Sequence, residues 1–202
     1  MNSILAIGAH PGDLELGCGA TLAKLSAAGI HVRALVLSDG LHGARRADDR
    51  CAETRLPLRL LGVSDVVQGD LPDTHLPSFV PRIVRMIESH CAEMLPDRVY
   101  TMLGDDRHQD HRAVFAASIV ACRAVPQVLS YDTPSSWPNF VPTVFEPIER
   151  FLDRKVAAIR CHRSQHHRDY MQEAHVRCNA QFRGQQVGVG PSEGFIAYKW
   201  VL

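Results

Sequence analysis

Short apolar runs alternate along this chain with longer stretches in which apolar residues recur every three or four positions. Runs 3–9 and 31–37 are almost continuously apolar, which is typical of strands buried on both faces of a parallel sheet. Glycine and proline mark the boundaries between elements. The pattern predicts strands at 3–9, 31–37, 65–68, 98–103, 127–131 and 194–202. It predicts helices at 17–28, 49–61, 79–94, 109–124, 147–163 and 165–182, with Pro57 expected to kink or interrupt the second.

Strands that alternate with helices indicate an α/β fold. We therefore expect residues 1–202 to form a single Rossmann-like domain, a mainly parallel twisted sheet with helices on both faces. A chain of 202 residues, 46% hydrophobic, is long enough to bury a substantial core. Ligands of such sheets bind outside the carboxyl ends of the strands, so candidate chemistry is expected in the loops that follow them.

Two of these loops carry metal-ligand residue types at tight spacing. His10 and Asp13 follow the first strand, and His108, Asp110 and His111 follow the fourth. A catalytic zinc ion takes three nitrogen or oxygen ligands and leaves one position for water. The two loops would meet if their strands were neighbours at a switch point of the sheet. Spacing alone leaves a metal site and ordinary loop residues equally open.

Charge and composition narrow the class of protein. Lys and Arg total 22 and so do Asp and Glu, so the zero net charge argues against a dedicated nucleic-acid or membrane-surface protein. The six cysteines form no C-x-x-C pair, which favours buried free thiols in a reducing compartment. The apolar run at the N-terminus is short and lacks a basic flank. We expect a cytoplasmic protein that does not span a membrane.

Two further patterns imitate functional motifs. Gly17 and Gly19, followed by Asp39, resemble a dinucleotide fingerprint, but Leu22 occupies the third glycine position and the glycines lie too far beyond the strand. A second cluster contains four histidines without an H-E-x-x-H spacing, and we interpret it as the polar face of a surface helix: His162, His166, His167 and His175.

The segment IGAHPGDLELGCGATLAKL, residues 7–25, resembles the A-H-P-D-D signature of the LmbE-like/PIG-L family of zinc-dependent N-deacetylases. HQDHRAV at 108–114 resembles the second motif of that family, H-x-D-H. Further similarities lie in R-C-A-E at 50–53 followed by L-G-V at 61–63, LPDTHL at 71–76, KVAAIRCHRSQ at 155–165 and EGFIAY at 193–198. The resemblance covers nearly the whole chain and favours the metal site.

The resemblance implies a role for each matching residue of the two motifs. His10, Asp13 and His111 would bind Zn²⁺, although such a set accepts other divalent metals as well. His108 would stabilise the oxyanion or protonate the leaving amine. Asp110 would orient a histidine, as carboxylates behind metal ligands do.

Other candidates for substrate contact lie outside the two motifs. Arg50 and Asp73 match family positions that contact the sugar or its polar substituent, although an arginine on a helix is often simply solvated or salt-bridged. Arg45 and Arg46 could meet a phosphate of a linked group, or belong to a solvated loop. Trp137 could wall a sugar site or anchor the core.

Gly12 departs from the family pattern at the chemical centre. The family has an aspartate there, which acts as the general base, and such a base contributes about 10²–10⁴-fold to the rate. Zinc alone lowers the pKa of its water to about 7, so we expect slower hydrolysis with metal and substrate binding largely kept. Glu15 and Asp39 are candidate replacements, although we expect Glu15 to face solvent or cap the following helix.

Two functions therefore remain. The first is a zinc-dependent hydrolase that removes an acetyl or similar acyl group from an N-acylated amino sugar, such as an N-acetylglucosamine conjugate, or from a related metabolite. The second is a non-catalytic member of the same fold that binds a sugar or a partner through the metal, which Gly12 favours. The expected partner is a small molecule, with neither nucleic acid nor membrane involved, and a homo-oligomer is compatible with the sequence.

Overall fold

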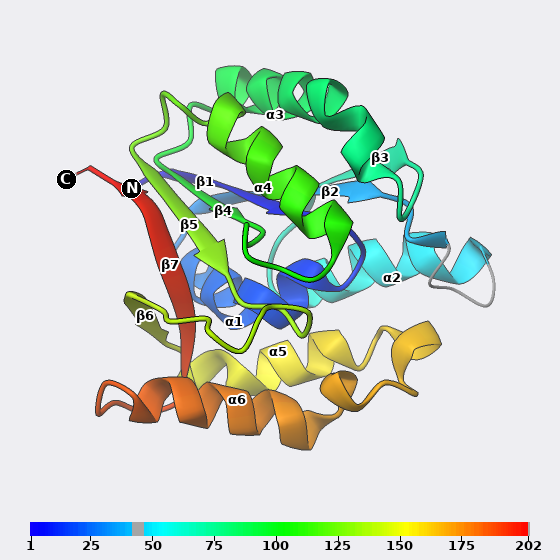
Figure 1. The fold of residues 1–202 in the computed structure, drawn as a ribbon. Helices are drawn as coiled ribbons and strands as arrows, with labels where there is room; N and C mark the ends of the chain where they lie inside the picture. Colours follow the sequence, from blue (N-terminus) through cyan, green and yellow to red (C-terminus); the bar gives the residue numbers. More distant parts are fainter. Residues whose placement is uncertain (42–46, 202) are drawn as a thin grey trace.

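One twisted sheet of seven strands organises the described part of the chain (Figure 1). The computed structural model describes residues 1–41 and 47–201, and the backbone alone for residues 47–51. The strand order is β3-β2-β1-β4-β5-β7-β6. The strands are β1 Ser3–Gly8, β2 His31–Ser38, β3 Asp65–Leu71, β4 Arg98–Thr101, β5 Gln127–Tyr131, β6 Val144–Pro147 and β7 Ser192–Trp200.

The first five strands run parallel, and β7 and β6 pair antiparallel at one edge. Strand β1 lies in the middle of the parallel part, and Ile4, Leu5 and Ile7 are completely buried there. Burial on both faces explains the continuous apolar run at the start of the chain. The expectation of a mainly parallel α/β sheet is confirmed.

Helices cover both faces of the sheet (Figure 1). Helices α3 Val80–Met94 and α4 Gln109–Ala121 lie on one face, and α1 Asp13–Ala27, α2 Ala47–Leu60 and α5 Leu152–Ile159 lie on the other. Helix α6, Glu173–Gln185, lies beyond α5 near β7. Within the described residues, every helix is too short or too polar to cross a membrane.

The structure corrects three details of the predicted elements. Pro57 lies inside α2, and the helix continues past it to Leu60. The proline-rich segment after β5 contains the short edge strand β6, which the sequence pattern did not predict. The prediction of two long C-terminal helices at 147–163 and 165–182 is wrong. The structure has the shorter helices α5 and α6 there, separated by 3-10 turns at Arg163–Gln165 and Asp169–Met171.

A tertiary contact explains the interruption between α5 and α6. Glu53 of α2 accepts hydrogen bonds from the backbone N–H of Ser164 at 2.8 Å and from its hydroxyl at 2.6 Å. The backbone at this position therefore takes a partner from another helix in place of its own helical partner. The chain consequently leaves the helical path near His162, whose side chain becomes fully buried.

The fold brings the two candidate loops together. Strands β1 and β4 are hydrogen-bonded neighbours, with Ala6 paired with Tyr100. The chain leaves β1 toward β2 on one side and leaves β4 toward β5 on the other, so the carboxyl ends of β1 and β4 form a switch point. The starts of α1 and α4 face each other there.

Candidate metal centre

His10 is oriented by two carboxylates that lie behind its ring. Its Nε2 is 2.9 Å from Oδ2 of Asp110 and 3.0 Å from Oδ1 of Asp73. A carboxylate only accepts hydrogen bonds, so Nε2 carries a proton, and in the neutral ring Nδ1 has the free lone pair. Nδ1 is the atom that faces Asp13, at 3.5 Å from Oδ2.

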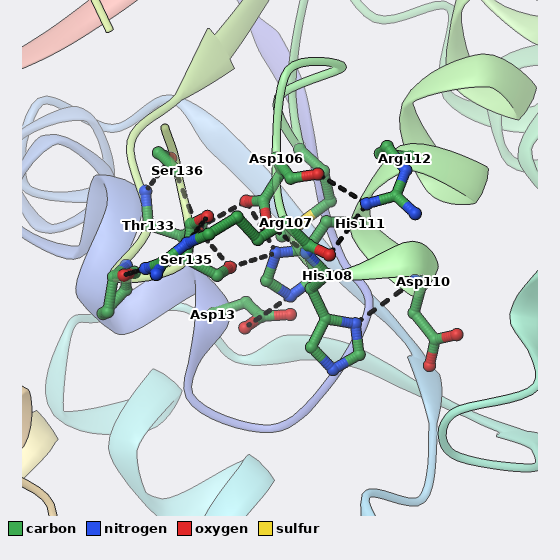
Figure 2. Close-up of polar contacts among 12 residues, drawn as sticks. Asp13, Asp106, Arg107, His108, Asp110, His111, Arg112, Thr133, Ser135 and Ser136 are labelled. Atoms are coloured by element: carbon green, nitrogen blue, oxygen red, sulfur yellow. Dashed lines mark hydrogen bonds and ion pairs between the residues drawn. The ribbon is translucent and has the colours of Figure 1, made fainter. Parts of the chain in front are cut away.

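His111 has the mirror-image arrangement (Figure 2). Its Nδ1 is 2.9 Å from Oδ2 of Asp106 and 3.1 Å from the hydroxyl of Ser135, so Nδ1 donates to the carboxylate. Its Nε2 is left with a free lone pair and lies 3.6 Å from Oδ1 of Asp13. In its neutral form, each histidine therefore presents one unprotonated nitrogen toward the same aspartate.

These distances fit a metal ion better than direct hydrogen bonds. Zinc bonds to nitrogen and oxygen of roughly 2.1 Å at a tetrahedral angle hold two ligand atoms about 3.4 Å apart. The separations of 3.5 Å from Asp13 Oδ2 to the His10 ring and of 3.6 Å from Asp13 Oδ1 to the His111 ring are close to this value. One ligand atom from each of His10, Asp13 and His111 lies within 4.8 Å of the others.

The charges around the site also favour a cation. Burial would lower the pKa of His10, but hydrogen bonds and charge from Asp110, Asp13 and Asp73 raise that pKa well above its usual value. Burial would raise the pKa of Asp106, but the hydrogen bond and charge of His111 lower it to about 2. Asp106 is therefore ionised at neutral pH, and its negative charge attracts a cation.

A second grouping, His10 with His108 and Asp110, is also compact but fits a metal less well. Asp110 already accepts the N–H of Thr74 at 2.8 Å and the N–H of Leu76 at 3.1 Å, besides its bond to His10. The Nδ1 of His108 accepts the N–H of Asp110. The lone pairs that a metal would need are therefore engaged in fixing the two loops.

His108 occupies the N-cap of α4 with its ring beside those of His10 and His111, at centroid distances of 4.8 and 4.7 Å. Burial lowers the pKa of His108, and the neighbouring His10 and His111 lower it further. The ring is therefore neutral at neutral pH. Since its Nδ1 accepts a hydrogen bond, the proton is on Nε2, which makes Nε2–H a donor.

A cavity of about 330 Å³ opens over these groups. Of the site residues expected from the sequence, those that line it are His10, Gly12, Asp13, Asp73, His108 and His111. Asp110 lies behind the cavity wall and is completely buried. Arg50 lies on α2, but its side chain is outside the described part of the chain, as are Arg45 and Arg46.

Gly12 adopts φ +105° and ends the loop at the start of α1. A Cβ built there would lie 3.6 Å from Cε1 of His162. His162 is fully buried, and its Nε2 is 3.3 Å from Oε1 of Glu15, which is only 2% exposed. The expectations that His162 lies on a surface helix and that Glu15 faces solvent are therefore wrong, because His162 packs against Gly12 and Glu15 is buried beside His162.

The remaining candidates lie away from the cavity. Asp39 accepts the N–H of Leu41 and does not line the cavity. Trp137 is 48% exposed, so it is not a core anchor, and it lines a separate shallow cavity. His166 and His167 are exposed.

The sequence interpretation missed several residues of the site. Asp106 is the principal one, because it bonds to His111, to the hydroxyl of Thr133 at 2.7 Å and to the N–H of His108 at 2.7 Å. Its place in the same strand-end loop as His108 was the available signal. The cavity is also lined by further residues from the β4 loop, the β5 loop and the segment before α6: Arg107, Pro134, Ser135, Gln165, Arg168, Tyr170 and Met171.

The fold and the cavity define an α/β protein with a His/Asp site at the switch point of its sheet. Comparison with known proteins identifies the family. Residues 5–122 match the family described as PIG-L, GlcNAc-PI de-N-acetylase, and the chain belongs to this PIG-L (LmbE-like) family. It is 44% identical over 167 residues to the uncharacterized deacetylase YaiS of Escherichia coli K12, covering 80% of this chain and 90% of that protein.

Solved structures show the same fold. The conserved protein TT1542 of Thermus thermophilus superposes with a TM-score of 0.88 at 26% identity, covering 100% of this chain and 97% of the other. The N,N′-diacetylchitobiose deacetylase of Pyrococcus horikoshii gives a TM-score of 0.83 at 27% identity, covering 97% of this chain and 83% of the other.

Proposed function

We propose that this protein is a metal-dependent N-deacetylase that releases acetate from an N-acetylated amino sugar. The observation that carries the proposal is the pair of oppositely oriented imidazoles, each with a carboxylate behind one nitrogen and Asp13 in front of the other. Family membership and the deacetylases among its relatives support the reaction, and the diacetylchitobiose enzyme supports a sugar substrate.

His10, Asp13 and His111 would hold the metal, which we take to be zinc, through the three facing atoms. When bound, such an ion polarises an amide carbonyl and lowers the pKa of a water molecule. Asp110 and Asp106 keep the two rings in the tautomers that leave those atoms unprotonated. Any site that lost one of these carboxylates would hold the cation less tightly.

His108 would act on the acyl group itself. Its neutral ring presents Nε2–H as a hydrogen-bond donor, and the residue lines the cavity. A donor in this position stabilises the negative charge that develops on the carbonyl oxygen during attack. The same proton is available to the nitrogen that leaves as an amine. Asp73 and Arg50 remain our candidates for contact with the sugar, Asp73 from the cavity wall.

Acetate release from N-acetylglucosamine and N,N′-diacetylchitobiose tests the proposal. We expect zinc-loaded protein to release acetate, and chelator-treated protein and the His111→Ala variant to release none above background. His167→Ala removes an exposed histidine away from the cavity and serves as the control. Undiminished release after chelation, or from His111→Ala, would contradict metal dependence.

Gly12 supports a second candidate, a metal-dependent sugar-binding protein without turnover, because residue 12 offers no carboxylate to the cavity. The test compares Gly12→Asp with Gly12→Ala. Both place a side chain at φ +105° and therefore carry the same backbone strain, about 1–3 kcal/mol. If Gly12→Asp exceeds Gly12→Ala in acetate release by about 10²-fold, the natural chain lacks a base. Sugar binding by calorimetry with no release from the natural chain would then favour the binding protein.

A further inference from the structure

Two cysteines meet where the neighbouring helices α3 and α4 end. Cys91 lies in the last turn of α3, Cys122 is the C-cap of α4, and their Sγ atoms are 3.9 Å apart. Both helices cover the same face of the sheet (Figure 1). The metal-ligand candidate His111 lies in the first turn of α4, so the cysteine pair is at the opposite end of that helix.

Hydrogen bonds hold the backbone at each cysteine. The N–H of Cys122 donates to the carbonyl of Ser118 at 2.8 Å, and the carbonyl of Cys122 accepts the N–H of Val125 at 2.9 Å. The carbonyl of Cys91 accepts the N–H of Leu95 at 2.9 Å, which ends α3. The contact between the two sulfur atoms is therefore part of the fold. The sulfur atoms of a disulfide are about 2.0 Å apart, and rotation of the side chains about Cα–Cβ is the movement that would close the gap.

The two thiols differ in their access to solvent. Cys91 is half-buried and lines a cavity of about 520 Å³, whereas Cys122 is 1% exposed and does not line it. The cavity has mostly apolar walls, including Ala92, Leu95 and Pro96. A small uncharged oxidant that enters this cavity reaches Cys91 directly, and it reaches Cys122 only through Cys91.

Cys91 is also the better nucleophile of the pair. The hydrogen bond with Cys122 lowers the pKa of the Cys91 thiol, although burial and the charge of Glu88 act in the opposite direction. The same hydrogen bond and burial raise the pKa of Cys122. Arg123 lies 2.6 Å from Oε1 of Glu88 and offsets the charge of that carboxylate. Since the thiolate is the reactive form of cysteine, the accessible thiol is the one that reacts first.

We propose that Cys91 and Cys122 form a reversible disulfide when the protein meets hydrogen peroxide. The Cys91 thiolate attacks one oxygen of the peroxide, so that an S–O bond forms and the O–O bond breaks. The hydroxide that leaves takes up the proton that Cys91 released on ionisation and becomes water. Cys91 is thereby oxidised to a sulfenic acid, and the peroxide is reduced.

Cys122 completes the reaction. Its sulfur attacks the sulfur of Cys91, so that the S–S bond forms and the S–O bond breaks, and the leaving hydroxide takes the proton of Cys122 to become a second water molecule. Two thiols and one hydrogen peroxide thus give one disulfide and two water molecules. A dithiol reductant reverses the change by thiol–disulfide exchange.

The disulfide would join the ends of α3 and α4 across a sequence separation of 31 residues. A crosslink of this kind stabilises a protein mainly by restricting the unfolded chain, so the oxidised chain should have the higher Tm. Neither cysteine lines the metal-site cavity. The inference therefore holds whether or not the proposed deacetylation does.

The test treats the purified chain with hydrogen peroxide, alkylates the remaining thiols in denaturant and maps the peptides by mass spectrometry without reduction. We expect a peptide in which Cys91 is linked to Cys122, and its disappearance after dithiothreitol. Cys122→Ser should form no such link and should leave a sulfenic acid at Cys91, which dimedone traps. Cys178→Ser removes an exposed cysteine of α6 and should form the link as the natural chain does.

Thermal unfolding of the same samples is the second readout. Peroxide should raise the Tm of the natural chain and of Cys178→Ser, and should not raise that of Cys122→Ser. The disulfide is overturned if Cys91 and Cys122 both remain open to alkylation at a peroxide concentration that oxidises Cys178, or if Cys91 is linked to a different cysteine. An unchanged Tm in a chain that carries the link would overturn its stabilising effect.

Discussion

Replacing Asp106 by asparagine should weaken zinc binding without touching a ligand of the metal. Asp106 accepts the Nδ1 proton of His111 at 2.9 Å, the hydroxyl of Thr133 at 2.7 Å and the N–H of His108 at 2.7 Å. One amide orientation turns an NH₂ group toward the N–H of His108. The other turns it toward His111 Nδ1, which favours the tautomer that protonates Nε2 and blocks the metal.

Both amide orientations therefore weaken zinc binding. Loss of a carboxylate behind a metal-binding histidine typically costs 10–100-fold in affinity, which corresponds to about 1.4–2.7 kcal/mol. The assay is a zinc titration in competition with a chromophoric chelator, after circular dichroism has shown that the metal-free variant is folded.

Asp105→Asn provides the matched control. It makes the same change of charge one residue away, at an exposed carboxylate that accepts, among the described residues, a hydrogen bond from Asn139. We expect zinc affinity within about twofold of the natural chain for this control. Equal affinities for Asp106→Asn and the natural chain, or equal losses in both variants, would refute the tautomer argument.

Three further predictions concern the scaffold. Gly17→Ala should lower the free energy of unfolding by about 1–3 kcal/mol, because its Cβ would lie 2.1 Å from Cδ2 of Tyr131. Lys155→Met should lower it by about 3–5 kcal/mol, because Glu193 would remain buried without its cation. Asp97 has a pKa below its usual value because backbone N–H groups donate hydrogen bonds to it. The ionised carboxylate therefore stabilises the folded protein above its unfolded pKa of about 3.9. This contribution is lost as the pH falls through the lower pKa of the folded state. Urea unfolding at a series of pH values should show Asp97→Asn losing stability at neutral pH and converging on the natural chain in acid.

Control variants make these predictions specific. Gly190→Ala should change unfolding little, since the nearest atom to its Cβ would be 3.8 Å away. Lys24→Met breaks a partly exposed ion pair with Glu146 and should cost less than about 1 kcal/mol. If Gly190→Ala destabilised the protein as much as Gly17→Ala, the packing argument would be contradicted, and a similar result for Lys24→Met and Lys155→Met would contradict the burial argument. A difference in stability between Asp97→Asn and the natural chain that stayed constant across pH would contradict the argument for Asp97.

Local sequence patterns predicted the parallel part of the sheet. They did not predict the segments whose conformation depends on tertiary contacts. The strands β1 and β2 follow from burial on both faces, which leaves a continuous apolar run. The segment between α5 and α6 has helical composition, but Glu53 captures the backbone at Ser164. Strand β6 has only four residues, at the edge of the sheet between prolines, and such a short segment has little periodicity to detect.

The candidate site could be predicted from the sequence to a similar extent. Two strand-end loops with metal-ligand residues could be expected to meet, because parallel strands end at one edge of the sheet. The side of each ring that faces Asp13 could not be predicted, since that depends on Asp106 and Asp110 lying about 3 Å from particular nitrogen atoms.

We propose that His10, Asp13 and His111 hold one divalent cation, and anomalous diffraction at the zinc edge, from crystals grown with zinc, can locate it. We expect one peak per chain, roughly 2.0–2.2 Å from His10 Nδ1, His111 Nε2 and an Asp13 oxygen. A peak bonded to His10 Nε2 with Asp110, or no peak between the two imidazoles, would contradict it.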